Sequence, residues 1–368
     1  MENTENKHTE VGTFACTNCG ADLKYKPGTQ HLTCEYCGAA NDIPQLETEI
    51  EELDFEKFVA DAEKNEEHIT ATFVKCGSCG ASSTLEPNVT SAQCPYCASP
   101  LVVDQAAEES VVSPKSLLPF KINKEKAKEE FNKWVKKLWF APKDLKKATL
   151  NFDQFKGIYI PYWTFDTDTQ TEYIGQRGEH YYVSESYTTT ENGKSVTKTR
   201  QVQRTRWYSA SGNVHKFFDD ILVVATKSLP KRYIYKLEPW DLENLVPFDK
   251  NYLSGFLAER YQVELGEGFE IAKDIADKKI RDLIRRDIGG DEQRITTLHT
   301  NYKDTKFKHI LLPVFVSAFK FKEKVYQFLV NGRTGEVQGE RPYSTIKIVL
   351  AILAGLIIAG VLYHFFSK

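Results

Sequence analysis

Eight cysteines occur in this chain, and all of them fall into two clusters that share one spacing. In each cluster a Cys-x2-Cys pair is followed, after fourteen residues, by a second Cys-x2-Cys pair. The first cluster consists of Cys16, Cys19, Cys34 and Cys37, and the second of Cys76, Cys79, Cys94 and Cys97. Paired thiolates at this spacing are typical of a tetrahedral site with four sulfur ligands. The sequence therefore predicts two metal sites and leaves no cysteine free to act as a nucleophile.

Zinc is the metal that a closed site of four cysteines favours, so we expect two zinc ions per chain in a structural role. Iron in the same sites would make the protein an electron carrier like rubredoxin, although the two Cys-x2-Cys knuckles of rubredoxin lie farther apart. Disulfide bonds are the other alternative and are typical of small secreted domains. Residues 1–10 are polar and acidic, which is unlike a cleavable signal peptide.

The elements that position the cysteines are repeated with a period of sixty residues. Cys19-Gly20-Ala21 matches Cys79-Gly80-Ala81, and Tyr36 matches Tyr96. We expect each copy to fold as a zinc ribbon, in which a short hairpin brings the two knuckles together. The predicted domains are a first ribbon over residues 1–45, a helical spacer over 46–72 (the helix itself over 46–68), a second ribbon over 73–104, a soluble α+β body over 105–342 and a membrane anchor over 343–368.

The anchor is predicted from nineteen residues, Ile348 to Phe366, that contain no Asp, Glu, Lys or Arg. A helix of this length spans about 28 Å, close to the thickness of the hydrocarbon core of a bilayer. We therefore expect a tail-anchored protein with a single span in the cell inner or plasma membrane. Reduced thiolates and the basic residues before the span favour a cytoplasmic N-terminal body. Ala351, Gly355 and Ala359 lie four residues apart and suit close helix packing, as in a homodimer.

The predicted body combines helices with a mainly antiparallel β-sheet. A helix that begins after an Asn123 N-cap and ends near Trp139 has an apolar face facing the core, or alternatively an anionic membrane. Asn192-Gly193 predicts a hairpin turn. The expected strands cover residues 157–174, 179–190, 194–208, 214–227, 310–321, 325–330 and 336–338, and the expected helices cover 253–261 and 270–288.

One arm of the predicted hairpin is strongly basic. It carries Lys194, Lys198, Arg200, Arg204 and Arg206 without an acidic residue. Such an arm is compatible with binding to nucleic acid or to anionic lipids, but also with a solvated edge neutralised by glutamates of the opposing arm. We consider nucleic acid an unlikely partner, because residues 1–72 hold sixteen acidic residues against five Lys or Arg.

Motifs of common enzymes are missing from the sequence. It contains no Gly-x4-Gly-Lys-Ser/Thr loop, no His-Glu-x-x-His and no Gly-x-Ser-x-Gly. His180 and His215 could meet in the β region, and Asp219-Asp220 could pair, but neighbours on a strand point to opposite faces. We therefore predict that the protein is not an enzyme.

Several stretches outside the ribbons also form a recognisable pattern, which includes Tyr159 to Asp166, Arg206 to Gly212 and Val330 to Val337. Together with the doubled ribbons and the terminal span, they resemble a family of bacterial double zinc-ribbon, single-span membrane proteins. These are often labelled primosomal-protein-like or superfamily II helicase-like, and they are similar to membrane partners of phage-shock-type stress systems. The resemblance implies a zinc-binding membrane adaptor that recruits a cytoplasmic or membrane protein partner, with the eight cysteines as its functional residues. The alternatives are a zinc-ribbon protein that binds nucleic acid and an iron electron carrier.

Overall fold

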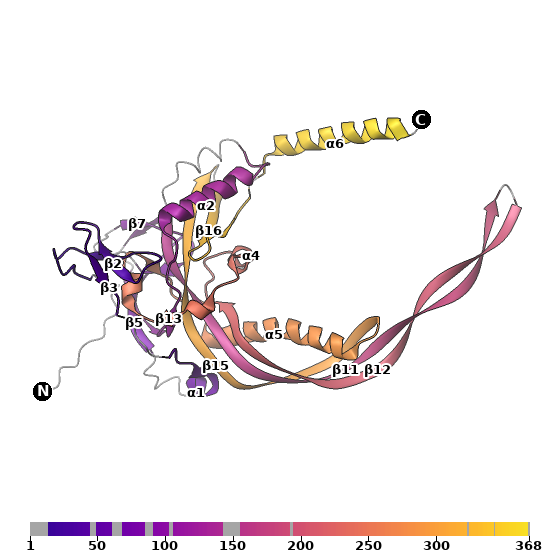
Figure 1. Ribbon diagram of the computed structural model, residues 1–368, viewed down its shortest axis with the longest axis horizontal. Coiled ribbons are helices and arrows are strands. Elements are labelled where there is room, and N and C mark those ends of the chain that lie inside the picture. The colour runs from indigo at the N-terminus through magenta and orange to yellow at the C-terminus, as the bar shows by residue number, and fades with distance from the viewer. Residues whose placement is uncertain are drawn as a thin grey trace.

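A computed structural model of the chain describes residues 14–44, 49–60, 68–84, 91–102, 106–142, 155–191, 194–321, 324–341 and 343–366. The fold is mixed, with more strand than helix. The two cysteine clusters lie near the N-terminus and an apolar helix lies at the C-terminal end. Figure 1 shows the cysteine-containing segments gathered at one end of a long curved sheet, from which a two-stranded arm extends to the other side.

Small sheets surround each cysteine cluster. The first has the strand order β1-β2-β3, and the second divides into a β6-β5-β9 sheet and a β7-β8 pair. Their bounds are β1 (Leu23–Tyr25), β2 (His31–Cys34), β3 (Ala40–Asp42), β5 (His68–Lys75), β6 (Ser82–Ser83), β7 (Ser91–Gln93), β8 (Pro100–Val102) and β9 (Ala106–Val112).

The main sheet is built on three long antiparallel strands in the order β12-β11-β15. Shorter strands extend it, and two contacts, β10 with β15 and β11 with β14, are parallel. Its strands are β4 (Leu53–Asp54), β10 (Ser116–Leu117), β11 (Lys156–Glu191), β12 (Lys194–Val224), β13 (Val246–Pro247), β14 (Leu257–Ala258), β15 (Glu292–Phe321), β16 (Lys324–Asn331) and β17 (Val337–Gly339).

Helices pack against this sheet or project from it. The α-helices are α1 (Phe55–Ala60), α2 (Lys124–Lys137), α4 (Lys231–Ile234), α5 (Leu265–Ile288) and α6 (Thr345–Phe366), and the 3-10 helices are η2 (Tyr235–Leu237), η3 (Leu242–Asn244) and η4 (Lys250–Leu253). The buried face of α5, with Ala272, Ala276, Ile280 and Ile284, packs against Trp163 and its neighbours in the sheet. In Figure 1 this helix follows the concave side of the sheet.

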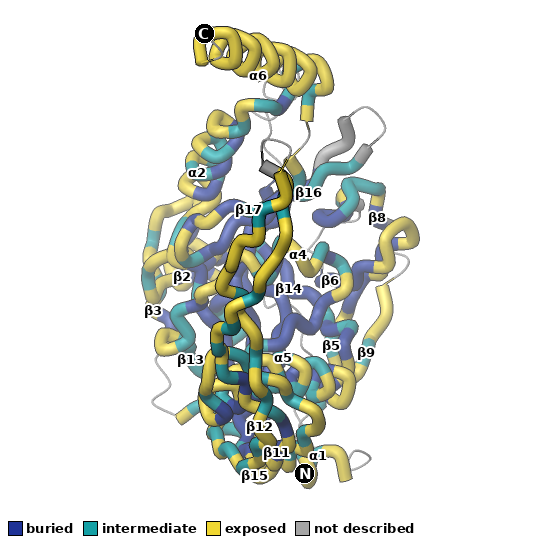
Figure 2. The backbone as a smooth tube through the Cα atoms, turned by 90° about the vertical axis from the view of Figure 1, so that its right-hand side faces the viewer, coloured by how far each residue is buried: buried dark blue, intermediate teal, exposed yellow. Residues whose placement is uncertain are grey.

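Beyond the sheet, β11 and β12 continue as an isolated arm. The pairing of β15 with β11 begins at Gly178↔Glu292, so β11 from residue 179 onward is paired with β12 alone. Figure 2 shows that most of this arm is exposed, as is most of α6. The predicted Asn192-Gly193 turn lies outside the described residues, and the pairing of β11 with β12 reaches Glu191↔Lys194 on either side of it.

Several predicted elements are confirmed and several are not. Helix α2 has the predicted Asn123 cap, whose side chain accepts a hydrogen bond from the backbone of Lys126, and its apolar face is buried. The strands predicted over 194–208 and 214–227 form a single strand, β12. The helix predicted over 253–261 is wrong, because the 3-10 helix η4 ends at Leu253 and strand β14 follows at Leu257–Ala258.

The predicted spacer helix is only partly present in the residues that the structure describes. Within the described part of residues 46–68, only Phe55–Ala60 is helical, and His68 begins strand β5. The preceding β4 pairs with β15 at Phe307↔Leu53, and Phe55 and Phe58 lie against the ring of Phe307. Tertiary pairing therefore replaces the helix that the periodic apolar residues predicted.

Candidate metal centres

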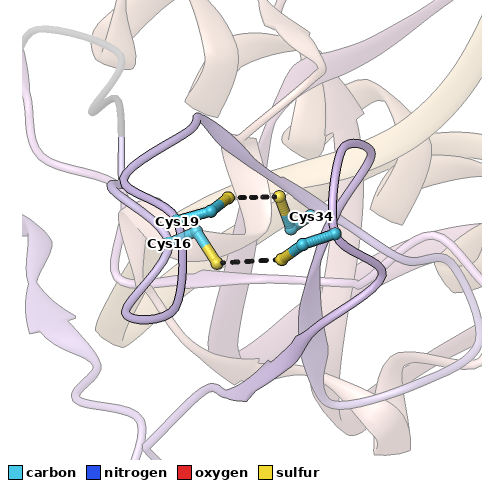
Figure 3. A group of neighbouring side chains, drawn as sticks. Cys16, Cys19 and Cys34 are labelled. Carbon is cyan, nitrogen blue, oxygen red and sulfur yellow. Dashed lines mark hydrogen bonds between the residues drawn. The ribbon is translucent and has the colours of Figure 1, made fainter.

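Each cysteine cluster brings four sulfur atoms together. The four Sγ atoms of a cluster all lie within 4.8 Å of one another. The contacts from one knuckle to the other measure 3.6 Å for Cys16–Cys37 and 3.5 Å for Cys19–Cys34 in the first cluster. In the second they measure 3.6 Å for both Cys76–Cys97 and Cys79–Cys94. Figure 3 shows the sulfur atoms of the first cluster facing one another across two opposed loops.

These distances fit a metal ion and exclude disulfides. Sulfur atoms around zinc at about 2.3 Å are about 3.8 Å apart along the edges of a tetrahedron. A disulfide needs about 2.05 Å, and all eight cysteines are free thiols. Both clusters can therefore hold a metal ion with four sulfur ligands, as the sequence predicted.

The four knuckles share one backbone turn. In each, an amide N–H donates to the carbonyl of the first cysteine, at 2.8 Å for Gly20, 3.0 Å for Gly38 and 2.8 Å for both Gly80 and Ala98. All four donors have positive φ, which explains the glycines and leaves Ala98 as the exception. The turn makes both cysteines of a knuckle available to the same ion.

One thiol in each cluster ionises easily, and the two occupy equivalent positions in the repeat. The backbone N–H of Ala39 is the main cause that lowers the pKa of Cys37 to about 6. Burial opposes ionisation of Cys97, but hydrogen bonds from Ser99 lower its pKa to about 7. Because the thiolate is the form that binds metal, these turns favour the binding form of Cys37 and Cys97, while the pKa values of Cys19 and Cys79 are raised to about 12.

The two cysteine-containing segments that the sequence predicts to be ribbons are called ribbon 1 and ribbon 2. Both contact one strip of the body, residues 254–259. In the first ribbon the backbone of Tyr25 donates to the carbonyl of Ser254 (3.0 Å), and the Tyr25 hydroxyl donates to the carbonyl of Phe120 (3.2 Å). In the second, the backbone of Thr84 donates to the carbonyl of Ala258 (2.9 Å), and Ser83 forms a β-bridge with Glu259. Apolar residues of each ribbon join a core cluster of the body.

The second knuckles of the two ribbons differ sharply in burial. Tyr36 is 86% exposed, whereas its repeat partner Tyr96 is 1% exposed. The carbonyl of Tyr96 accepts a hydrogen bond from Gln327 on β16 (2.6 Å), and its ring lies in a core cluster with Ile160 and Leu329. Ribbon 1 therefore presents its knuckle to solvent, while ribbon 2 inserts the same knuckle into the body.

A buried carboxyl lies beside the inserted knuckle. Glu259 accepts a hydrogen bond from Thr226 (2.7 Å), and its carboxyl adjoins the hydroxyl of Tyr96. Burial raises the pKa of Glu259 to about 7, against the neighbouring hydroxyl groups of Ser228, Thr226 and Tyr96, which lower it. Nothing in the local sequence marked this residue, because the strip on which it lies was expected to be helical.

A cluster of charged residues that the sequence did not predict joins the segment between the ribbons to the sheet. The Lys308 amino group lies 3.0 Å from both Glu52 and Asp220 and 3.9 Å from Asp166. Burial raises the pKa of Asp166 to about 6. These residues come from β11, β12, β15 and the segment before β4, so only the tertiary fold brings them together. The arrangement pairs one buried cation with three carboxyls and fastens the chain between the two metal centres.

The histidines and aspartates considered from sequence do not form a shared site. His180 bonds to Glu292 (2.8 Å) and His215 to Asp168 (2.6 Å). In the β11–β12 register, the two histidines are ten residues apart, which is about 33 Å along a strand. Asp220 belongs to the Lys308 cluster instead, and its backbone N–H donates a hydrogen bond to Asp166 (2.6 Å).

The basic residues on strand β12 of this arm are partly neutralised, as the second of the two interpretations predicted. Both Arg200 and Arg204 form ion pairs with Glu185 of the opposing strand. The guanidinium of Arg206 lies over the ring of Tyr181, 4.9 Å from its centre. These contacts involve Arg200, Arg204 and Arg206.

Comparison with known proteins gives one relative. The chain is 27% identical over 338 residues to the uncharacterized protein YdjG of Bacillus subtilis (strain 168), and the match covers 91% of this chain and 92% of YdjG. No family model and no solved structure matches. The cysteine clusters are thus compatible with the zinc ribbons of the family resemblance, while membership of that particular family stays a prediction.

Proposed function

We propose that this chain is a tail-anchored membrane adaptor that holds two zinc ions and recruits a cytoplasmic protein through its first ribbon. The body lies on the cytoplasmic side, α6 crosses the bilayer, and the knuckle of ribbon 1 is the contact surface. The proposal includes no catalytic step, because a closed site of four cysteines keeps no coordination position open for a substrate.

The contrast between Tyr36 and Tyr96 is the observation that carries this proposal. The two tyrosines occupy the same position in a duplicated unit, and the buried copy is used to dock onto the body. The tyrosine that is 86% exposed in the other copy is suited to contact a partner, since aromatic side chains are typical anchors of protein interfaces. The second knuckle of ribbon 1 is thus available to contact a partner, in the way that the second knuckle of ribbon 2 contacts the body.

Helix α6 supports the membrane attachment. It is 22 residues long, apolar and unburied, and its length corresponds to about 33 Å. Its start is fastened to the end of α2, where Lys347 donates to the carbonyls of Trp139 (3.0 Å) and Ala141 (2.7 Å). Figures 1 and 2 both place the two helices next to each other. Trp139 and Tyr343 are exposed at this junction, as is typical of aromatic residues at a membrane interface.

Zinc and a cytoplasmic body are supported by the chemistry of the cysteines. Eight free thiols require a reducing compartment, and four sulfur ligands with short spacing favour zinc over the iron of an electron carrier. The acidic N-terminal region and the ion-paired arm give the nucleic-acid alternative little support.

Affinity purification of the full chain from membranes in mild detergent tests the proposal. We expect a specific protein to co-purify with the natural chain, and to be lost in Tyr36→Ala, in Cys16→Ser and in Cys76→Ser. Tyr182→Ala is the matched control, because Tyr182 is also an exposed aromatic residue but lies on the arm. Recovery of background proteins alone would contradict the proposal. So would a partner that is lost in Tyr182→Ala and kept in Tyr36→Ala.

A further inference from the structure

An open, polar cavity lies on the body beside the start of helix α6. It has a volume of about 410 Å³ and is formed by α4, η2, strands β16 and β17 and the residues that lead into α6. Figures 1 and 2 both place α4 beside β16. Three cations and three tyrosines line the cavity, namely Arg232, Lys236, Arg341, Tyr233, Tyr326 and Tyr343.

The wall of this cavity carries an excess of positive charge. Glu340 is the one carboxylate among its described lining residues, and it lies 3.7 Å from the guanidinium of Arg232. A single carboxylate balances one of the three cations at most, so the wall keeps two positive charges in excess. Such a wall favours an anion, because close cations with few counter-charges attract negative ligands.

Aromatic rings position two of these cations. The guanidinium of Arg232 lies over the ring of Tyr233, 4.6 Å from its centre, and that of Arg341 lies over the ring of Trp134 at 5.7 Å. A ring contact of this kind favours the cation without using its N–H donors. Guanidinium groups held in this way suit a phosphate, whose oxygens accept several hydrogen bonds at once.

The cavity adjoins the predicted membrane span. Tyr343 lines it and lies two residues before Thr345, where α6 begins. Two residues span at most about 7 Å, and the headgroup layer on each side of a bilayer is about 5–8 Å thick. The proposed function, on which this inference rests, places α6 in the bilayer, and the cavity then lies at the level of the lipid headgroups.

We propose that this cavity binds the headgroup of an anionic phospholipid, with its phosphate contacted by Arg232, Lys236 and Arg341. The volume is in the range of ligand sites, which is about 300–1,000 Å³. A zwitterionic headgroup adds a cation of its own, which the excess positive charge disfavours. A free phosphate ion shares the chemistry of the headgroup, but the position beside α6 favours a lipid.

Calorimetric titration of the full chain in an uncharged mild detergent tests the inference. The probes are phosphatidylglycerol, whose headgroup has a net negative charge, and phosphatidylcholine, whose headgroup is zwitterionic, with the same acyl chains. We expect phosphatidylglycerol to bind at a single site per chain. Phosphatidylcholine should bind at least about fivefold more weakly, since each cation near an anionic headgroup contributes about this factor.

Two lysines on one short segment separate the cavity from the general surface charge. Lys236→Gln removes a lining cation and is expected to weaken the binding of phosphatidylglycerol about fivefold. Lys231→Gln removes the same charge from an exposed residue that does not line the cavity, and is expected to leave the affinity unchanged. Equal affinity for the two lipids, or equal losses in the two variants, would overturn the inference.

Inorganic phosphate distinguishes a lipid from a free anion as the ligand. It is added to the titration and compared with sodium chloride of equal ionic strength, so that screening by salt is the same in both. We expect the binding of phosphatidylglycerol to be equal in the two salts, because a free ion has no acyl chains beside α6. Displacement of the lipid by phosphate would overturn its assignment as the ligand.

Flotation with vesicles of phosphatidylcholine alone tests the attachment by α6 separately. A chain that floats with these vesicles but does not prefer phosphatidylglycerol contradicts this inference and leaves the proposed function intact. A chain that does not float contradicts the membrane attachment, and this inference with it.

Discussion

The two ribbons share a cysteine spacing and are repeated sixty residues apart, yet they differ in how far the second knuckle is buried in the body. Both lay a strand against residues 254–259, so this part of their docking is the same. Ribbon 2 also inserts its second knuckle, with Tyr96 buried among residues of the sheet. Ribbon 1 leaves the equivalent knuckle in solvent with Tyr36 exposed. Duplication has thus produced one copy that stabilises the body and one that is available to another molecule.

The largest expected effect is the difference in free energy of unfolding between variants of the two tyrosines. Tyr96→Ala removes a buried aromatic ring and should lower the free energy of unfolding by about 3 kcal/mol or more. Tyr36→Ala removes an exposed ring and should change it by less than about 0.5 kcal/mol. Urea unfolding of both variants in zinc-containing buffer, followed by circular dichroism, measures the difference. Similar losses in the two variants would show that the knuckles are docked alike.

A pH-dependent effect of intermediate size is expected at Glu259, which lies beside the knuckle of ribbon 2 alone. Its pKa rises from 4.5 to about 7 on folding, so between these pH values the folded chain holds a proton that the unfolded chain releases. Stability contributed by this group is therefore lost as the pH rises through this window. Glu259→Gln carries no such proton, and its stability relative to the natural chain should increase by about 2–3 kcal/mol from pH 4.5 to pH 8.

Unfolding of the two proteins at a series of pH values gives this difference directly. The comparison is needed because His309 acts in the opposite direction. Burial lowers the pKa of His309 from 6.5 to about 4, so its contribution falls as the pH falls through that range. His309 is common to both proteins and cancels from their difference. A difference that does not change with pH would mean that Glu259 is ionised in the folded chain.

The smallest expected effect concerns the rate of metal loss. Cys19 and Cys37 of ribbon 1 are exposed, whereas in ribbon 2 only Cys79 is fully exposed and the second knuckle is covered. A chelator should therefore remove metal in two phases, with ribbon 1 faster by about tenfold, since local opening costs less at an uncovered site. Release can be followed with a coloured chelator, and Cys37→Ser should abolish the fast phase only. A single phase that removes both ions would contradict the difference between the ribbons.

Features encoded over short distances were predictable from the sequence. The cysteine spacing identified both metal centres, the Asn123 cap and apolar periodicity identified α2, and helix α5 was found, although it begins earlier than predicted, at Leu265. Each of these depends on residues close together in the chain, where local preferences decide the structure.

Features that depend on distant contacts were not predictable. Strand β11 continues through Gly175, which local preference would treat as a break. In the fold a side chain there would place its Cβ 2.3 Å from the carbonyl oxygen of Arg294, so close strand approach requires glycine. The Lys308 cluster, the docking strip at 254–259 and the burial of Tyr96 likewise arise from residues that only the tertiary fold brings together.

Metal analysis of the full chain, extracted from washed membranes in mild detergent, tests the central claim most directly. The account predicts a colourless protein that remains with the membrane fraction and contains two zinc ions per chain, with all eight cysteines reduced. A metal-free chain with disulfide bonds, a red iron protein, or a chain recovered in the soluble fraction would contradict it.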